Sequence, residues 1–267
     1  WTVSGPIIDF FQAILFYIFG ISWKSYILSG SLLNILITIL FYNALREYKL
    51  SRKTNLFYCF SFLILANPSM GVPFPDHFSS FLSLGAILLF IILIKKKESF
   101  YWTAIPFLFF IAFFSKQTPA TYLLLSYLII LVFYYFLYKK LFFIKYFALS
   151  SFLCVSIFIL FMYLSGISFE SFVNQYISYP RSIGEERLEN YKFNISNTLN
   201  NFKFIYFVIL FTATQIFFQL KNKMIKIEKE KFLINLALIL VSCSFIFHQI
   251  LTMNFIYIFF LIPLIAG

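Results

Sequence analysis

One short polar stretch, NPSMGVPFPDHFSS, carries the residues best suited to catalysis. In it, Asp76 and His77 follow Pro73 and Pro75 and come directly before an apolar run. An adjacent aspartate and histidine can act as acid and base, orient a hydroxyl group or bind a divalent cation. A simpler alternative is that Asp76 caps the helix that follows, because aspartate is favoured at helix N-caps. Asp76 and His77 are therefore candidate catalytic residues and candidate metal ligands.

A second polar stretch, SKQTP, interrupts a long apolar segment and contains Lys116 and Gln117. At a membrane surface a lysine can bind a phosphate group, and a glutamine can hydrogen-bond to a phosphate or sugar oxygen. The alternative is that Lys116 only extends its ammonium group to the lipid headgroups. We interpret Lys116 and Gln117 as candidate substrate-binding residues.

The third candidate region is the polar segment from 165 to 203, where basic, acidic and tyrosine residues alternate. Arginine binds phosphate and tyrosine stacks on sugar rings, so Arg181, Arg187 and Tyr179 are candidate substrate-binding residues. A solvated amphipathic helix is the alternative, since Glu185 and Glu189 are four residues apart. The four glutamates of this segment argue against nucleic acid as a partner.

The composition requires that these stretches be positioned by membrane-spanning helices. The chain has 267 residues, of which 61% are hydrophobic and 12% charged, and its mean hydropathy is +0.89. That leaves too little polar surface for a water-soluble globule of this size. The apolar runs are long and do not show the alternating pattern of barrel strands. The sequence predicts an all-α, polytopic transmembrane helical bundle, a single domain over residues 1–267.

The net charge of +11 comes mostly from four basic clusters that separate the apolar runs. They are Arg46, Lys49, Arg52 and Lys53; Lys95, Lys96 and Lys97; Lys139, Lys140 and Lys145; and Lys221, Lys223, Lys226, Lys229 and Lys231. The positive-inside rule places all four on the cytoplasmic side, so each interval between clusters must cross the membrane twice. The interval from 100 to 138 would reach about 58 Å as one helix, far more than a hydrocarbon core of about 30 Å, so it must be a hairpin turning at residues 115–119. The expected spans are 27–45, 55–66, 79–94, two arms within 100–138, 146–164, 204–220 and 232–247.

All stretches without a basic cluster then fall on the outer face: PFPDHFSS, SKQTP, the outer loop at 165–203, and FHQ within a predicted turn, HQILTMN. Residues 67–75 are expected to be irregular backbone, which near lipid requires a protein-lined or aqueous cavity. The opening stretch GPIIDFFQAILFYIFG, with Pro6 at a helix start and Gly20 at its stop, is expected to form either a short interfacial helix or a partly inserted one; Asp9 and Gln12 favour the interface. The chain begins at Trp1 and ends in an apolar run, so we expect it to be a piece truncated at both ends.

Three segments resemble the polytopic GT-C glycosyltransferases, in the branch of the protein mannosyltransferases and other polyprenyl-phosphate-sugar transferases. They are SGPIIDFFQAILFYIFG with the run that follows it, NPSMGVPFPDHFSSFLSLGAILLF, and IAFFSKQTPATYLLLSYLIIL, and together they span most of the chain. The resemblance implies transfer of a sugar from a polyprenyl-phosphate donor to a lipid, glycan or protein acceptor at the outer face. It also implies a catalytic acidic residue in a first outer loop, which this sequence does not include.

Two other functions stay open on the sequence. A lipid-linked polysaccharide polymerase or ligase would use the same kind of donor. A transporter or flippase would use the outer residues as a gate, although transporters usually carry their polar residues at the bilayer midplane. The excess of Phe, Ile, Lys, Asn and Tyr suggests an AT-rich genome and favours a bacterial inner membrane, with the active site facing the periplasm, over the endoplasmic reticulum.

Overall fold

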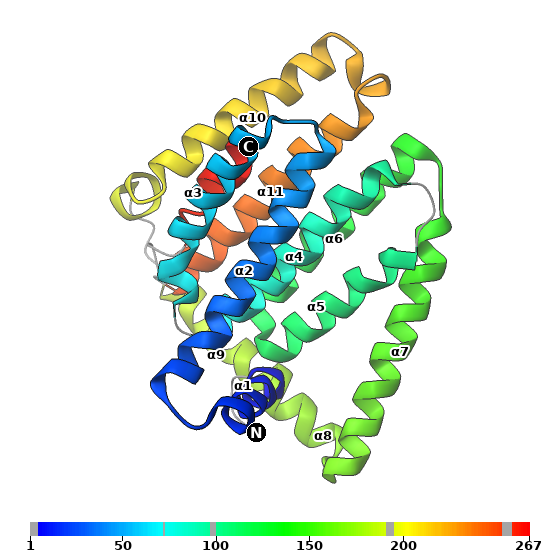
Figure 1. Cartoon of the computed structure of the whole chain (residues 1–267). Helices are drawn as coiled ribbons and strands as arrows, with labels where there is room; N and C mark the ends of the chain where they lie inside the picture. The colour runs from blue at the N-terminus through cyan, green and yellow to red at the C-terminus, as the bar shows by residue number, and fades with distance from the viewer. Residues whose placement is uncertain (1–4, 72, 97–99, 191–194, 253–257) are drawn as a thin grey trace.

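The computed structural model describes residues 5–71, 73–96, 100–190, 195–252 and 258–267. All secondary structure in these ranges is helical (Figure 1). In chain order the elements are α1 (Pro6–Phe19), α2 (Trp23–Glu47), α3 (Arg52–Met70), α4 (Pro75–Lys95), η1 (Phe100–Thr103), α5 (Ala104–Ser115), α6 (Gln117–Tyr138), α7 (Phe142–Ser165), α8 (Phe169–Phe172), η2 (Val173–Ser178), α9 (Tyr179–Glu189), η3 (Ser196–Asn200), α10 (Lys203–Lys221), η4 (Met224–Lys226), α11 (Lys229–Thr252) and α12 (Leu261–Ala266).

Within the described part of the chain, six helices are long and apolar enough to cross a membrane: α2, α4, α6, α7, α10 and α11. Large apolar side chains cover the outer surfaces of α7 and α10; Phe152 and Phe207, for example, are 69% and 73% exposed. Such a surface is unfavourable in water but suits contact with lipid. The structure therefore indicates an integral membrane protein built as a helical bundle, as the composition predicted.

Helix α4 lies at the centre of the bundle, and every residue from 78 to 88 is buried. It packs on α2, α5 and α6. Gly85 permits the close approach of α2, because a Cβ atom at this position would lie 2.8 Å from the Cδ1 of Ile37. Asp76 and His77 thus lie in the first turn of α4, which is the most deeply buried of the six long apolar helices.

Residues 100–138 form a helical hairpin, as predicted, but only its second arm, α6, is among the six helices long and apolar enough to cross a membrane. The first arm, α5, has 12 residues, and α3, which contains the predicted span 55–66, is not among the six either. Helices α5 and α6 are separated by Lys116 alone, whose backbone is extended (φ −162°, ψ 132°). The Ser79 hydroxyl of α4 donates a hydrogen bond to the Lys116 carbonyl at 2.8 Å. Since Ser79 is fully buried, this bond fixes the turn against the central helix.

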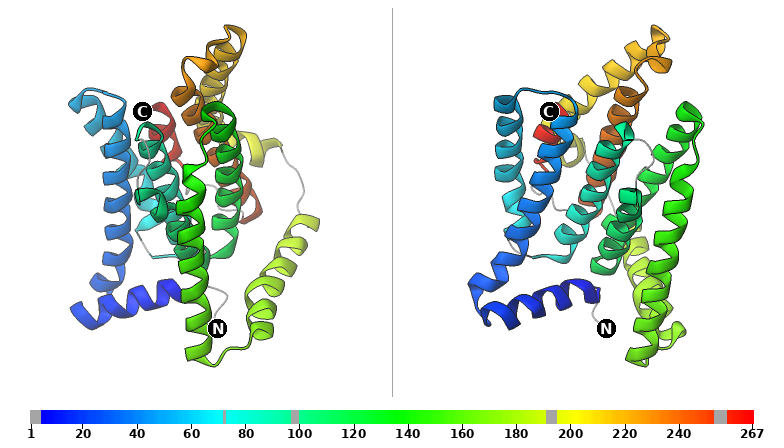
Figure 2. Two further views of the ribbon diagram at one scale, coloured as in Figure 1. Left: turned by 90° about the vertical axis from the view of Figure 1, so that its right-hand side faces the viewer. Right: turned by 45° about the vertical axis from the view of Figure 1, so that its right-hand side comes forward.

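The short first helix is also confirmed. Pro6 occupies its first turn, and Gly20 ends it with a φ of 76°, a conformation that favours glycine. Figure 2 shows α1 lying across one end of the bundle, nearly perpendicular to α2. Gly5, just before it, packs so tightly that a Cβ atom would lie 1.7 Å from the Phe114 carbonyl oxygen and 2.3 Å from the Tyr176 hydroxyl. Helix α1 is thereby joined to the α5–α6 turn.

The four basic clusters meet at the opposite end of the bundle. Lys95, at the end of α4, donates to the carbonyl oxygen of Glu47 and lies 3.9 Å from the centre of the Tyr48 ring, at the end of α2. Lys229, at the start of α11, lies 5.4 Å from the ring of Tyr138, at the end of α6. The separation of basic and outer stretches inferred from the sequence is therefore present in three dimensions.

Two predicted turns are wrong in extent. Helix α3 continues through Pro68 to Met70, so most of residues 67–75 is helical rather than irregular; the Gly71 N–H closes the last turn on the Asn67 carbonyl at 2.6 Å. Helix α11 continues to Thr252, because no glycine or proline interrupts it. His248 and Gln249 are therefore helical. The remainder of the predicted HQILTMN turn, residues 253–254, lies outside the described residues.

The segment from 165 to 203 is mostly helical rather than an extended loop. Elements α8, η2 and α9 form one continuous helical rod from Phe169 to Glu189, and the middle part is a π-helical turn. The rod lies at the same end as α1, in the yellow-green of Figure 2. The amphipathic-helix alternative for this segment therefore describes its backbone correctly.

The orientation in the membrane is our first prediction. In a cysteine-free background, single cysteines at the exposed positions Ser182 and Glu189 should react with a membrane-impermeant thiol reagent in intact cells, whereas cysteines at the exposed Ser51 and Asn222 should not. The reason is that the last two positions belong to the basic end, which the positive-inside rule places in the cytoplasm. Labelling at Ser51 and Asn222 alone would show that the opposite end faces the cytoplasm.

Candidate functional site

A polar pocket of about 90 Å³ lies at the end opposite the basic clusters. It is formed where the α5–α6 turn, α9 and the end of α11 come together. Lys116, Arg187 and His248 contribute its ionisable side chains, one from each of these elements. The remaining lining residues are Gln117, Thr118, Tyr122, Pro180, Ile183, Gly184, Leu251 and Thr252. Three stretches identified as outer by their polarity thus line one cavity.

His248 faces the acidic residue at the start of α4. Its Nε2 lies 3.6 Å from the Oδ1 of Asp76, and its side chain is only 3% exposed, against 24% for Asp76. This distance is longer than a hydrogen bond of about 2.7–3.2 Å but short enough for a salt bridge if the imidazole is protonated. Catalytic hydrogen bonds are often long before the substrate binds. His248 therefore lines the pocket, and Asp76, which is not itself a lining residue, lies next to it.

Asp76 does not cap its helix, contrary to the simpler alternative above. The N-cap is Phe74, Pro75 is the first helical residue, and no side chain caps this end of α4. Proline takes the first helical position because its fixed φ suits the helix and its missing N–H would be unpaired there anyway. The carboxylate of Asp76 is therefore free of a capping role and is directed at His248.

Lys116 and Gln117 lie together at the α5–α6 turn, as predicted. Lys116 is half-buried, and it forms no salt bridge with any described residue. The amide nitrogen of Gln117 donates to the Tyr176 carbonyl at 3.1 Å. Its buried Oε1 has no hydrogen-bond partner among the described residues. The turn thus presents a cation and a hydrogen-bond acceptor to the pocket.

The helical rod from Phe169 to Glu189 is held against this turn by Tyr176. The Tyr176 hydroxyl donates to the Phe113 carbonyl at 2.7 Å, and its ring stacks on Phe114 with 5.6 Å between the ring centres. Burial raises the pKa of Tyr176, so the hydroxyl stays protonated and remains a donor.

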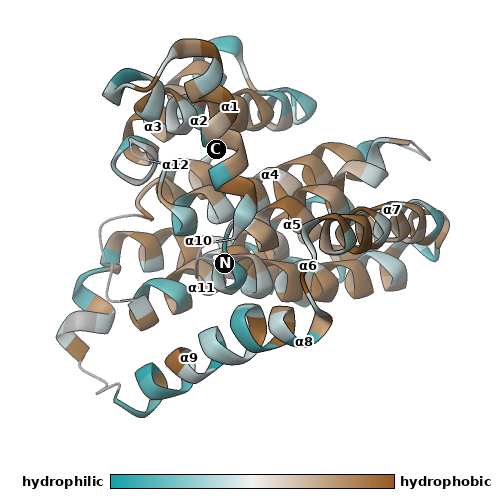
Figure 3. Ribbon diagram, turned by 90° about the horizontal axis from the view of Figure 1, so that it is seen from below, coloured by the Kyte–Doolittle hydropathy of each residue, from teal (hydrophilic) through white to brown (hydrophobic). Residues whose placement is uncertain are grey.

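Seen from the end of the bundle that carries α1, α8 and α9 have more hydrophilic residues than α5 and α7 (Figure 3). π-Helical turns such as the one bearing Tyr176 occur frequently at functional sites.

The three candidates on α9 occupy different positions. Arg187 lines the polar pocket and forms no salt bridge with a described residue. Arg181 is paired with Glu185 at 2.8 Å, and this i,i+4 pair is exposed, as the amphipathic-helix alternative predicted. Tyr179 is 53% exposed and lines neither this pocket nor the groove beside it. Of the three, Arg187 has the geometry of a ligand-binding residue.

An apolar groove of about 380 Å³ adjoins the polar pocket. The two cavities share several lining residues, including Gln117, Tyr122 and Gly184. The other lining residues of the groove are mainly apolar, among them Phe113, Ile177 and Leu188, and they also include the ion pair of Arg181 and Glu185. The combined site is therefore amphipathic: Lys116 and Arg187, which have no salt-bridge partner among the described residues, line the polar pocket, and mainly apolar side chains line the groove.

His77 does not line the polar pocket. It lines a separate pocket of about 10 Å³ beside Phe81, Phe245 and Gln249, and its ring contacts Phe74 at 5.8 Å between ring centres. No group of three or more His, Cys, Asp or Glu side chains in the described ranges is placed to hold a metal ion. The structure thus pairs Asp76 with His248 rather than directing Asp76 and His77 into one cavity.

His248 is a candidate catalytic residue that was not predicted from the sequence, although the stretch FHQ was expected on the outer face. The signal that could have identified it is the presence of only two histidines in the chain, both in segments predicted to face outward.

Comparison with protein-family models, with characterised proteins and with solved structures finds no match to this chain.

Proposed function

We propose that this protein is a membrane glycosyltransferase that moves a sugar from a polyprenyl-phosphate donor to a lipid, glycan or protein acceptor at the outer face. The observation that carries the proposal is the amphipathic site. Lys116 and Arg187 supply two cations without salt-bridge partners among the described residues, and an apolar groove adjoins them. A lipid phosphate has the complementary chemistry, because its phosphate binds cations while its chain needs an apolar surface. The volume of about 90 Å³ suits a phosphate group, and the groove suits the lipid or sugar.

The proposed reaction needs a base and stabilisation of a leaving phosphate. The acceptor oxygen forms a bond to the anomeric carbon, the bond from that carbon to the phosphate oxygen breaks, and the electron pair leaves with the phosphate. Lys116 and Arg187 stabilise the negative charge of the leaving group. The proton of the acceptor hydroxyl passes to the imidazole of His248, whose Nε2 lies 3.6 Å from the Oδ1 of Asp76. Asp76 orients the imidazole and stabilises its protonated form.

The distribution of polar residues favours this chemistry over transport. The polar contacts between α6 and α11 midway along the bundle are made by neutral serine hydroxyls: Ser126 Oγ lies 2.7 Å from Ser244 Oγ, and each hydroxyl also donates to a backbone carbonyl of the other helix. The Lys, Arg, Asp and Glu residues of the described ranges lie towards the two ends of the bundle instead. Transporters usually bind their substrates near the midplane through interrupted helices. A polysaccharide polymerase or ligase would share the lipid phosphate site, and the identity of the acceptor separates it from the transferase.

Donor binding by Lys116 is the test of the proposal. In the full-length protein, Lys116→Ala should weaken the binding of polyprenyl phosphate by about ten- to a hundredfold, the equivalent of one charge-assisted contact of about 1.5–3 kcal/mol. The matched control is Lys24→Ala, an exposed lysine at the start of α2 and outside the pocket. Binding can be measured by titration in detergent. Equal affinities in the wild type and both variants would mean that Lys116 only reaches the headgroups, and would remove the main support for the proposal.

A further inference from the structure

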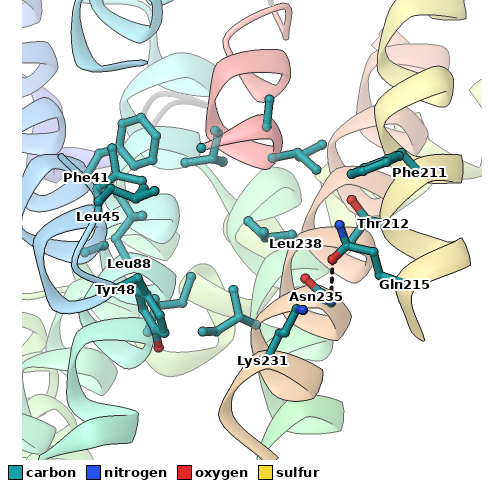
Figure 4. A pocket seen from close by; sticks show the side chains of 18 residues that line it. Phe41, Leu45, Tyr48, Leu88, Phe211, Thr212, Gln215, Lys231, Asn235 and Leu238 are labelled. Atoms are coloured by element: carbon teal, nitrogen blue, oxygen red, sulfur yellow. Dashed lines mark hydrogen bonds between the residues drawn. The ribbon is translucent and has the colours of Figure 1, made fainter. Parts of the chain in front are cut away.

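A second cavity, of about 350 Å³, lies at the basic end of the bundle, far along the helices from the site above. Helices α2 and α4 form one wall, α10 and α11 the other, and α12 contributes Leu264 and Ile265 (Figure 4). Its volume lies within the range of about 300–1,000 Å³ typical of small-molecule sites. The proposed sugar transfer makes no use of this cavity.

The cavity has a polar end and an apolar end. Figure 4 shows Tyr48 and Lys231 at one end and Phe41 and Phe211 at the other. Along α11, Lys231 and Leu238 are seven residues and therefore about 10 Å apart. The lining changes from a cation to aliphatic and aromatic side chains over this length. Such a gradient matches a ligand with a polar head and an apolar chain.

An amide pair lies between the two ends. The Asn235 side-chain nitrogen donates to the Oε1 of Gln215 at 3.3 Å, across from α11 to α10 (Figure 4). The amide nitrogen of Gln215 makes no hydrogen bond of its own within the described part of the chain. It can donate to a carbonyl oxygen of a ligand. The polar groups thus follow one another in the order cation, then amide.

The cavity is open to its surroundings at both the polar end and the α10 side. The Lys231 side chain is 58% exposed, and its nearest acidic partner, Glu228, is 3.9 Å away and also accepts a hydrogen bond from Gln219. Phe211 is 61% exposed on the outer surface of α10. A ligand could therefore enter from the lipid phase and place its head beside Lys231.

We propose that this cavity binds an anionic glycerophospholipid, independently of the proposed transferase activity. The phosphate contacts Lys231, an ester carbonyl accepts from Gln215, and an acyl chain lies along Leu238, Phe211 and Leu264. Charge complementarity selects an anionic over a neutral lipid, because this end of the bundle collects the four basic clusters. Basic residues at a membrane surface attract anionic lipids in this way.

Photo-crosslinking tests the proposal. The full-length protein is placed in phosphatidylcholine vesicles with a minor share of phosphatidylglycerol, and a photoactivatable acyl chain is attached to one lipid or the other. Peptide mass spectrometry should then find adducts of the phosphatidylglycerol probe on α10, α11 and α12, in at least about five-fold excess over the phosphatidylcholine probe. Lys231→Glu should reduce these adducts about five-fold or more. The exposed Lys221→Glu, which makes the same charge change outside the cavity, should reduce them less than about two-fold.

Ala266→Trp is a second variant that does not alter charge. Ala266 is exposed and lines the cavity, so a large side chain there should block the entrance and suppress the adducts without disturbing the core. Equal labelling by the two probes, or an equal loss of adducts in the two glutamate variants, would mean that lipids contact the cavity only as they contact the rest of the membrane-facing surface. Either result would overturn the proposal. A folded protein without adducts in the cavity would overturn it as well.

Discussion

Replacing His248 with glutamine is expected to slow sugar transfer by about 10²–10⁴-fold, the usual contribution of a positioned acid–base group. Glutamine keeps a polar side chain of similar length but cannot accept the acceptor proton at neutral pH. Because Lys116 and Arg187 are untouched, the affinity for polyprenyl phosphate should stay within about two-fold. The measurements are single-turnover transfer from polyprenyl-phosphate sugars and the binding titration used for Lys116.

The matched control variant is His77→Gln, the same change in the other histidine. His77 lines a separate, water-sized pocket, so its loss should affect turnover much less. If the chemistry instead belongs to Asp76 and His77, as the sequence suggested, the two variants would exchange their effects. Gln249→Met, one residue beyond His248 in α11, controls for disturbance of the helix, because the buried Oε1 of Gln249 has no partner among the described residues.

The elements that could be predicted from the sequence were those with a strong local signal. The apolar interval from 100 to 138 is too long for one crossing and has a single polar break, so the turn at Lys116 followed from length alone. Likewise Pro6 and Gly20 gave the bounds of α1, since each has a well-defined preference at a helix end. The separation of basic and outer stretches followed from the placement of charge.

The errors came from polar residues whose partners are distant in the sequence. His248 and Gln249 resembled a turn because polar side chains are unfavourable inside a lipid-exposed helix, but both are buried against protein. No local pattern could show that Asp76 lies 3.6 Å from His248, since this contact depends on the packing of α4 beside α11. The capping hypothesis failed for a related reason: a Pro-Asp pair fits either a capping aspartate or a proline at the first helical position, and the structure has the second.

Asp76→Asn should reduce turnover by about 10²–10⁴-fold while leaving expression and folding nearly unchanged. The structure gives Asp76 no capping hydrogen bond, so the substitution removes only a charge from the first turn of α4, worth about 0.3–1 kcal/mol. The matched control is Asp9→Asn, because Asp9 also lies in the first turn of a helix that begins with proline, but in α1 and exposed. Thermal unfolding in detergent and turnover, measured together, separate the stability effect from the catalytic one.

The double variant Asp76→Asn with His248→Gln then shows whether the two residues act as one unit. If Asp76 acts by orienting His248 and stabilising its protonated form, the double variant should be no slower than His248→Gln alone. In the absence of the imidazole, the loss of Asp76 has no further effect on turnover. Losses that multiply would instead assign Asp76 a separate role, such as contact with the acceptor. Near-wild-type turnover in Asp76→Asn would leave the start of α4 a structural element and would contradict a role for Asp76 in the chemistry.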